Sequence, residues 1–282
     1  MSIGIIGLGF VGIAIEKFFS SKISVFTYDI NKKCSEKSLA DLLQKTDLIF
    51  ICLPTPMNKN GSCNISIIEN VLLEINELSS DKEIHIVIKS TIPIGTTDYF
   101  SQKFPKLNIC FNPEFLTEKN SFIDFENQKK ILIGKVKNYH PVENLYHKFF
   151  PNSKIELLLT QECEIIKYIS NSFLALKVSY ANEIFELCNA LKINYSNIVN
   201  ILKSDERLGP SHWNVPGADN KRGYGGSCFP KDMASLIFQF ELNKINPIIL
   251  KSSWERNIAI DRKEKDWENL IGRSVVSDFN ND

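Results

Sequence analysis

The sequence lacks the patterns that mark membrane-spanning and nucleic-acid-binding proteins. No run of 18 or more apolar residues occurs, so no membrane-spanning helix is expected. The 33 basic and 33 acidic side chains among 282 residues give a formal net charge of 0. A chain without a basic excess has no electrostatic reason to bind nucleic acid or an anionic membrane surface. We therefore predict neither as a partner.

The seven cysteines include no C-x-x-C pair. Scattered thiols in odd number argue against a disulfide framework and against a structural zinc site. We accordingly predict no metal and a reducing, cytoplasmic location. The apolar start of the chain, residues 3–15, lacks a basic flank and is interrupted by glycines, so we do not interpret it as a signal peptide.

The composition is that of an ordinary globular protein, with 43% hydrophobic and 23% charged residues and enough length for two domains. Short apolar runs alternate with helical patterns up to about residue 160. This alternation is typical of a doubly wound, Rossmann-type sheet with right-handed crossovers. Strands are expected at residues 2–6, 23–28, 47–52, 84–88, 107–111, 131–133 and 155–159.

The helical pattern then becomes continuous. Apolar residues recur at helical spacing from about residue 162 to 191, with no glycine or proline between them. The predicted fold class is α/β, an N-terminal doubly wound Rossmann-type sheet followed by an all-α domain with a long central helix. We place domains at residues 1–160, 161–262 and 263–282, the last being a polar C-terminal tail. Because so long a helix suits contact between subunits, we expect a homodimer.

A glycine-rich turn follows the first strand in the pattern G-x-G-x-x-G. Its first glycine permits the turn, its second lets backbone approach a diphosphate, and its third lets helix and strand pack closely. Asp29 ends the second strand about 20 residues later, where an acid can bind the ribose of NAD and repel the extra phosphate of NADP. A turn or capping aspartate is the alternative. We predict NAD as the cofactor, bound by Gly7, Gly9, Phe10, Val11, Gly12 and Asp29.

Hydroxyl and carboxylate side chains follow the later strands. Thr55 follows the third strand, Thr91 the fourth, and Glu114 and Glu118 the fifth. The carboxyl ends of parallel strands form the edge at which ligands bind in open α/β sheets. The threonines can bind a ligand or cap a helix. The two acids share a face if their turn is helical, and then one can act as a general base, or they form a solvated pair.

Residues 223–232, which read GYGGSCFPKD, hold the most reactive group. The glycines predict a tight loop, and Pro230 with the apolar run after it predicts a helix that starts just beyond Cys228. At a helix N-terminus beside Lys231, the pKa of the thiol should fall and the thiolate become a nucleophile. A buried structural cysteine is the alternative.

Two further features suit a charged substrate. Lys167 and Asn171 lie one turn apart on the long helix and can together hold an oxyanion, although a surface lysine with an ordinary neighbour is the alternative. The loop of residues 205–226 is unusually long and carries basic groups, Arg207 among them, as a diphosphate-bearing substrate requires.

Together these segments resemble the UDP-glucose/GDP-mannose dehydrogenase family. The resemblance covers residues 1 to about 260, and the family usually carries a further nucleotide-binding-like domain, which we expect this chain to lack. Its seven motifs stand in the family's order: GLGFVG, LPTP, KSTIPIGTT, NPEFLTE, ECEIIKYISNSFLALK, RLG and GYGGSCFPKD.

The resemblance implies a role for each matching residue. Cys228 resembles the nucleophile, Asp232 and Thr91 resemble residues that position or activate the hydrolytic water, and Lys167 with Asn171 resembles the oxyanion-stabilising pair. Glu118 resembles the glutamate of thioester hydrolysis and, with Thr55 and Thr91, a cofactor contact. Arg207 is similar to an arginine that reaches the sugar nucleotide of a neighbouring subunit. The implied substrate contacts are Glu114, Phe115, Leu116, Lys167, Asn171, Arg207, Tyr224 and Gly225, with Glu114 also in the catalytic pocket.

The implied reaction is an NAD-dependent four-electron oxidation of UDP-glucose to UDP-glucuronate through a thiohemiacetal and a thioester on Cys228. The alternatives are the same chemistry on another nucleotide sugar, a single-step dehydrogenase of the β-hydroxyacid type, and a truncated, non-catalytic sugar-nucleotide binder. The single-step enzyme and the binder have no use for the thiol. The presence of Cys228 together with Lys167, Asn171 and Asp232 in one sequence therefore argues against both.

Overall fold

The computed structural model describes residues 1–79 and 82–279. The chain divides into two compact units. Unit 1 consists of residues 1–55 and 65–167, and unit 2 of residues 56–64 and 168–282. Each cluster of buried hydrophobic residues lies within one unit. The domain boundaries inferred from the sequence pattern stay a prediction.

Unit 1 is built on a parallel five-stranded sheet in the order β2-β1-β3-β4-β5. Every residue of β3 and β4 is buried, which explains why β3 is a continuous apolar run and β4 is apolar except at His85. The predicted doubly wound, Rossmann-type sheet is thereby confirmed. The strands are β1 (Ser2–Ile6), β2 (Ser24–Tyr28), β3 (Leu48–Ile51), β4 (Ile84–Ile88) and β5 (Leu107–Phe111).

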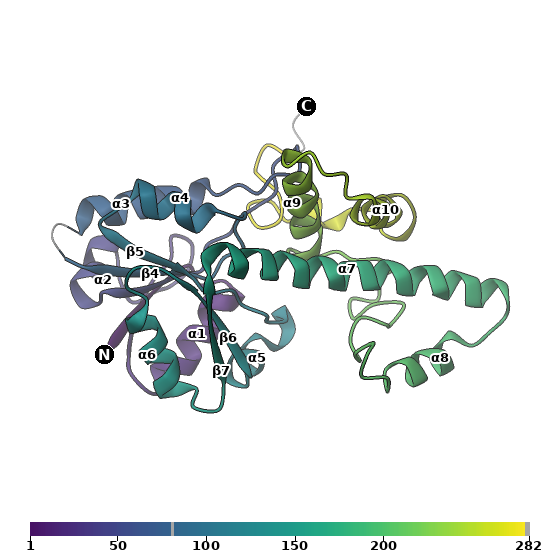
Figure 1. Cartoon of the computed structure of the whole chain (residues 1–282), viewed down its shortest axis with the longest axis horizontal. Coiled ribbons are helices and arrows are strands. Elements are labelled where there is room, and N and C mark those ends of the chain that lie inside the picture. Colours follow the sequence, from purple (N-terminus) through teal and green to yellow (C-terminus); the bar gives the residue numbers. More distant parts are fainter. Residues whose placement is uncertain (80–81, 280–282) are drawn as a thin grey trace. The chain divides into compact units, whose positions relative to one another are not determined.

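Helices cover both faces of this sheet (Figure 1). One hydrophobic cluster joins the sheet to α1, α5 and α6, and a second joins it to α2, α3 and α4. The two clusters alternate along the strands, because successive side chains of a strand point to opposite faces. The helices are α1 (Phe10–Ser20), α2 (Leu39–Lys45), α3 (Ser66–Leu78), α4 (Thr96–Lys103), α5 (Ser121–Glu126) and α6 (His140–Phe149).

A second, two-stranded parallel sheet completes unit 1, and helix α7 (Thr160–Ala190) follows it. Its strands, β6 (Lys130–Lys135) and β7 (Lys154–Leu159), match two of the predicted strands. Near its start, α7 is tied to α4 by the buried Glu164, which accepts hydrogen bonds from the N–H of Gly95 and of Thr97. Such a carboxylate satisfies donors that a helix N-terminus leaves unpaired. Burial raises the pKa of this glutamate nonetheless.

Unit 2 is helical, as predicted for the second half of the chain. It contains the later part of α7, then α8 (Tyr195–Leu202), α9 (Phe229–Leu242) and α10 (Ile248–Arg256). A π-helical segment, Asn257–Asp261, continues α10 directly, and a 3-10 turn, Asp266–Asn269, follows. In the described part of the chain, no helix is long and apolar enough to cross a membrane.

The segment expected as a polar tail packs into unit 2. Trp267 and Val275 are 1% and 0% exposed and share a hydrophobic cluster with Met57. The N–H of Met57 donates to the carbonyl oxygen of Ser274 at 2.7 Å, and the N–H of Val276 donates to the carbonyl oxygen of Met57 at 3.0 Å. The end of the chain thus holds the loop of residues 56–64 within this unit.

Candidate functional site

The glycine turn of unit 1 lies where the winding of the sheet changes direction. Strand β1 pairs with β2 on one side and with β3 on the other, so the carboxyl ends of β1 and β3 adjoin at a topological switch point. Open α/β sheets bind their ligands at this point. The first turn of α1 begins there, with Gly9 as its N-cap and no side-chain cap. Its N–H groups, which lack partners within the helix, suit an anion.

Each glycine of the turn meets a different requirement. Gly7 has a φ of +91°, a left-handed conformation that other residues rarely adopt. A Cβ at Gly12 would lie well under 3.0 Å from the carbonyl oxygen of Gly7, so helix and strand could not pack as they do. A Cβ at Gly9 would meet nothing within 4 Å, which leaves its backbone open to a ligand. The turn therefore fits the diphosphate of NAD.

Asp29 follows β2 and holds the glycine turn in place. Its carboxylate accepts hydrogen bonds from the N–H of Leu8 at 2.7 Å, of Asn31 at 2.8 Å and of Lys32 at 2.9 Å. The turn-forming role considered from sequence is therefore present. The Asp29 carboxylate lies beside the glycine turn. Its contact with the ribose of NAD stays a prediction.

Thr55 and Thr91 lie together at the carboxyl ends of β3 and β4. The Thr55 hydroxyl donates to the carbonyl oxygen of Thr91 at 2.8 Å, and Ser90 donates to the carbonyl oxygen of Leu53 at 2.6 Å. Both threonines are buried. These bonds join two loops at the ligand-binding edge of the sheet. The structure thus gathers the glycine turn, Asp29 and both threonines in unit 1.

Lys167 is not a surface lysine. It is 3% exposed, and its ammonium donates to the carbonyl oxygen of Glu114 at 2.6 Å and to the Glu114 carboxylate at 3.1 Å. A buried lysine requires such a partner, because removing an ammonium from water is costly. The Glu114 carboxylate also accepts the N–H of Leu116 at 2.6 Å. Lys167 of α7 and Glu114 of the loop that follows β5 therefore form a buried charge pair.

The remaining predicted residues of this loop are more exposed. Phe115 is 40% exposed, and the Lys167 ammonium lies 5.4 Å from the centre of its ring. Glu118 is exposed and begins a short 3-10 turn, while the residues from Asn112 to Thr117 are irregular. The helical arrangement considered for Glu114 and Glu118 is therefore wrong. Pro113 lacks an N–H, and the Glu114 side chain bonds backbone two residues on, which favours a turn over a helix.

The sequence analysis missed Lys89, the residue just before Ser90 and Thr91. It is 2% exposed, and its ammonium donates to the Asn112 side-chain oxygen at 2.7 Å. The Tyr146 hydroxyl donates to the same oxygen. Burial lowers the pKa of Lys89 from 10.5 to about 8. A lysine directly after the largely apolar strand β4 was the available signal, since its side chain begins inside the sheet.

The free energy of unfolding should therefore rise with pH through the depressed pKa of Lys89. Between about pH 8 and 10.5 the unfolded chain keeps this proton and the folded chain loses it, so stability increases with pH. We expect a gain of about 2 kcal/mol between about pH 7.5 and 9.5. Urea unfolding of wild type and Lys89→Met measures it as the difference between the two proteins. Lys17→Met, at an exposed position, is the control and should reproduce the wild-type pH dependence.

Cys228 occupies the N-cap position of α9, as the sequence predicted. Pro230 lies in the first turn, where its missing N–H costs nothing. The Cys228 thiol is half-buried and lies 3.7 Å from the Ser227 hydroxyl. The backbone carbonyl oxygen of Cys228 accepts a hydrogen bond from the N–H of Asp232 at 3.0 Å. The positive end of the α9 dipole is thus adjacent to the thiol, an arrangement that stabilises a thiolate.

The predicted site residue Asp232 bonds to two polar side chains of unit 2. It is 1% exposed, accepts a hydrogen bond from the Asn171 amide at 2.5 Å and forms an ion pair with the Lys231 ammonium at 2.6 Å. Burial alone would lower the pKa of Lys231, but the Asp232 carboxylate outweighs it and raises that pKa above its ordinary value. Lys231 is a second residue that the sequence analysis did not assign to the site. Its ammonium gives the buried carboxylate a partner of opposite charge.

Three predicted substrate contacts are placed very differently. The Arg207 side chain is 88% exposed and forms an ion pair with Asp205 at 2.6 Å. Tyr224 is 2% exposed, and its ring packs with Ala175 and Met233 in the core. The Tyr224 ring therefore stabilises unit 2 and presents no face to a ligand. Gly225 is partly exposed in the turn before Cys228.

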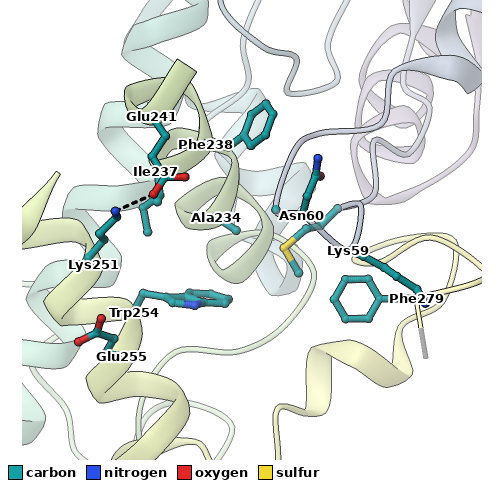
Figure 2. Close-up of a pocket in the computed structure, with 12 residues that line it drawn as sticks. Lys59, Asn60, Ala234, Ile237, Phe238, Glu241, Lys251, Trp254, Glu255 and Phe279 are labelled. Carbon is teal, nitrogen blue, oxygen red and sulfur yellow. Dashed lines mark ion pairs between the residues drawn. The ribbon is translucent and has the colours of Figure 1, made fainter. Parts of the chain in front are cut away.

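A surface pocket of unit 2 is lined by none of these residues. It has a volume of about 420 Å³, and none of its lining residues was predicted as a site residue. Figure 2 shows Trp254 on one side, Phe279 on another, and the Lys251–Glu241 ion pair of 2.6 Å at the rim. Among the described residues, no group of His, Cys, Asp or Glu side chains could hold a metal ion.

The sheet order, the glycine turn at the switch point and the helical second unit define the class of the protein, one with an NAD-binding domain of the Rossmann type followed by a helical unit. More specifically, the chain belongs to the UDP-glucose/GDP-mannose dehydrogenase family. Residues 34–150 match the NAD binding domain of that family, and residues 161–259 match its central domain. The resemblance seen in the motifs is confirmed, and so is NAD as the cofactor.

Individual relatives agree with this placement. The UDP-glucose 6-dehydrogenase of Pseudomonas aeruginosa is 32% identical over 235 residues, which are 78% of this chain and 50% of that protein. The structure of a UDP-glucose dehydrogenase from Pyrobaculum islandicum superposes with a TM-score of 0.81 at 26% identity, covering 91% of this chain and 67% of that one. A UDP-D-ManNAc dehydrogenase from Pyrococcus horikoshii shares the fold, with a TM-score of 0.77 at 21% identity over 91% of this chain and 68% of that one. The chain spans about half the length of the UDP-glucose 6-dehydrogenases that it matches.

Proposed function

We propose that this protein oxidises UDP-glucose to UDP-glucuronate by removing four electrons in two NAD-dependent steps. The observation that carries the proposal is the Cys228 thiol at the N-terminus of α9, with Asp232 in the first turn of that helix bonded to Asn171. The curated relatives named UDP-glucose 6-dehydrogenase support UDP-glucose as the substrate. NAD, held at the turn of Gly7, Gly9 and Gly12, would supply the acceptor for the hydride that each oxidation releases.

Lys167 and Asn171 act on the oxygen of the reacting carbon. As the primary alcohol of the sugar loses a proton and a hydride, negative charge develops on that oxygen. An ammonium and an amide donor stabilise such charge before the aldehyde forms. Lys167 is held for this task by Glu114, and Asn171 by Asp232. Both donors belong to α7, where they lie one helical turn apart in the sequence.

Cys228 makes the second oxidation possible without release of the aldehyde. Its thiolate adds to the aldehyde carbon, and the oxygen takes up a proton, which gives a thiohemiacetal. Loss of a proton and a second hydride leaves a thioester. Water then adds to the thioester carbon, the C–S bond breaks and the thiolate returns as the carboxylate leaves. We assign Asp232, Thr91 and Glu118 to the positioning and activation of this water.

Oligomeric state and location belong to the same proposal. The Arg207 side chain projects into solvent, as an arginine that serves the substrate of a neighbouring subunit must. Helix α7 presents exposed apolar residues in unit 2, among them Phe173, Tyr180 and Leu187, which suit a helix contact between copies. We propose a homodimer. The absence of paired cysteine patterns in the sequence supports a cytoplasmic location.

The same chemistry on another nucleotide sugar is the second candidate. Its support is the fold shared with a UDP-D-ManNAc dehydrogenase. Both sugars would need the same Lys167, Asn171 and Cys228, because the oxidised carbon is a primary alcohol in each case on this proposal. A panel of UDP-sugars and GDP-mannose, compared by kcat/KM, ranks these substrates.

The number of NAD molecules reduced per UDP-glucose consumed tests the proposal. We expect two, with UDP-glucuronate as the product, because each oxidation transfers one hydride. Absorbance of reduced NAD at limiting UDP-glucose gives the number, and chromatography identifies the sugar product. A value of one with an aldehyde product would contradict the thioester route. No reduction with any sugar of the panel would contradict the dehydrogenase itself.

A further inference from the structure

Two buried side chains support the turn that precedes Cys228, and the proposed mechanism uses neither. Asn257 is 0% exposed, and its side-chain amide pairs with both backbone groups of Tyr224. The Tyr224 N–H donates to the Asn257 oxygen at 2.9 Å, and the Asn257 amide donates to the Tyr224 carbonyl oxygen at 2.9 Å. These two hydrogen bonds fix the orientation of the Tyr224 backbone in the turn.

Arg262 supports the same turn from a second position. It is 2% exposed and donates to the carbonyl oxygen of Arg222 at 3.2 Å. Its guanidinium is fixed by two bonds to the Asp266 carboxylate, of 3.0 and 2.8 Å, and by one to Asp219 of 2.6 Å. A planar guanidinium held by two carboxylates is a rigid surface. Gly225 packs directly on that surface.

The π-helical segment brings these two side chains to the same turn. The N–H of Arg262 donates to the carbonyl oxygen of Asn257 at 2.7 Å, a bond between residues five apart. An α-helix bonds residues four apart and would set side chains five apart on different faces. Short π segments of this kind occur frequently at functional sites.

The turn packs so closely on Asn257 and Arg262 that two of its glycines leave no room for a side chain. A Cβ at Gly223 would fall well under 3.0 Å from the Asn257 side-chain oxygen. A Cβ at Gly225 would fall under 3.0 Å from three atoms of the Arg262 guanidinium. At Gly226 a Cβ would meet nothing within 4 Å. Two of the three glycines are therefore required by this contact.

We propose that Asn257 and Arg262 form a platform that positions Cys228 for thiohemiacetal formation. The Asn257–Arg262 platform holds the turn of residues 223–226, and the turn sets where α9 begins and hence where the Cys228 sulfur lies. Neither side chain touches the reacting atoms on this proposal, so both are positioning residues. The inference rests on the proposed role of Cys228 as the nucleophile.

The ratio of reduced NAD to UDP-glucose consumed separates positioning from simple stability. In Asn257→Leu the thiol is misplaced, so we expect the ratio to fall from two toward one, with aldehyde trapped by hydroxylamine. The first oxidation should slow less than about 3-fold and the second more than about 10-fold. A variant that only unfolds more easily would lose both steps equally and keep a ratio of two, which would overturn the proposal.

Two further variants keep the test decisive if Asn257→Leu does not fold. Arg262→Lys retains the charge but loses the planar fork, and Gly225→Ala pushes the turn away from the guanidinium. Both should lower the ratio in the same way. Asn243→Leu, at the exposed C-cap of α9, is the matched control and should keep a ratio of two. Folding is verified for each by circular dichroism.

Alkylation by iodoacetamide tests the platform independently of turnover. Peptide mass spectrometry follows the rate at Cys228, with Cys34 of unit 1 as the internal reference. We expect the Cys228 rate to change at least 5-fold in Asn257→Leu and Arg262→Lys, and the Cys34 rate to stay constant. If wild type reduces no NAD, the proposed function fails while this rate still decides on the platform. An unchanged Cys228 rate in folded variants would overturn the platform alone.

Discussion

Cys228→Ser should abolish formation of UDP-glucuronate, with kcat lowered by more than about 10³-fold, because a serine hydroxyl ionises far less readily than a thiol and is a poor nucleophile toward the aldehyde. NAD binding should be unchanged, since the glycine turn and Asp29 belong to unit 1 and Cys228 to unit 2. Steady-state kinetics with product chromatography measures the first effect, and titration of NAD by fluorescence measures the second.

The comparison needs a thiol that plays no part in the reaction. Cys34→Ser is the matched control, because Cys34 is also half-buried and lies outside unit 2. Turnover should persist in that variant. Unchanged carboxylate formation in Cys228→Ser would contradict the thioester route and require a four-electron oxidation that does not use this thiol. Loss of NAD binding in the same variant would point to a general folding defect instead.

Lys167→Met should lower kcat for the first oxidation by about 10²- to 10³-fold, because one donor to the developing oxyanion is lost. The same change leaves the Glu114 carboxylate buried without its cation. Breaking a buried pair from one side costs about 3–5 kcal/mol, so the free energy of unfolding should fall as well. Pre-steady-state reduction of NAD measures the rate, and urea unfolding measures the stability.

A second substitution separates these two effects. Glu114→Gln added to Lys167→Met removes the uncompensated charge, so stability should recover by a large part of the loss. The oxidation rate should not recover, since the ammonium is still absent. Recovery of the rate together with stability would show that Lys167 only holds the loop after β5. Equal rates in Lys167→Met and wild type would contradict the oxyanion role outright.

Much of the fold was predictable because its signals are local. A parallel strand buried on both faces is usually rich in apolar residues, as β3 is throughout and β4 is at every position except His85. A helix without glycine or proline over thirty residues was equally plain, and α7 spans Thr160–Ala190. The start of α9 just after Cys228 followed from Pro230, whose fixed φ suits a first helical turn.

The partners of the site residues were not predictable, because they come from distant segments. The sequence left open whether Lys167 was a surface residue, and only its bonds to Glu114, 53 positions earlier, show that it is buried. Tyr224 was predicted as a substrate contact from its motif, and only the structure shows that its ring packs against Ala175 and Met233 in the core. Helical continuity between Glu114 and Glu118 was considered from spacing, but a side-chain bond to backbone favours a turn.

The sequence by itself determined which reactive side chains this protein has and which strand or glycine turn each of them follows. Strand ends and glycine spacing are properties of neighbouring residues, so they can be recognised locally. Only the tertiary structure decided which charges are buried and what holds them. The bond of the buried Lys89 to Asn112, the bond of Asp232 to Asn171, and the packing of Gly225 on Arg262 all join residues far apart in the chain. Their energies depend on exclusion of water, which no local pattern records.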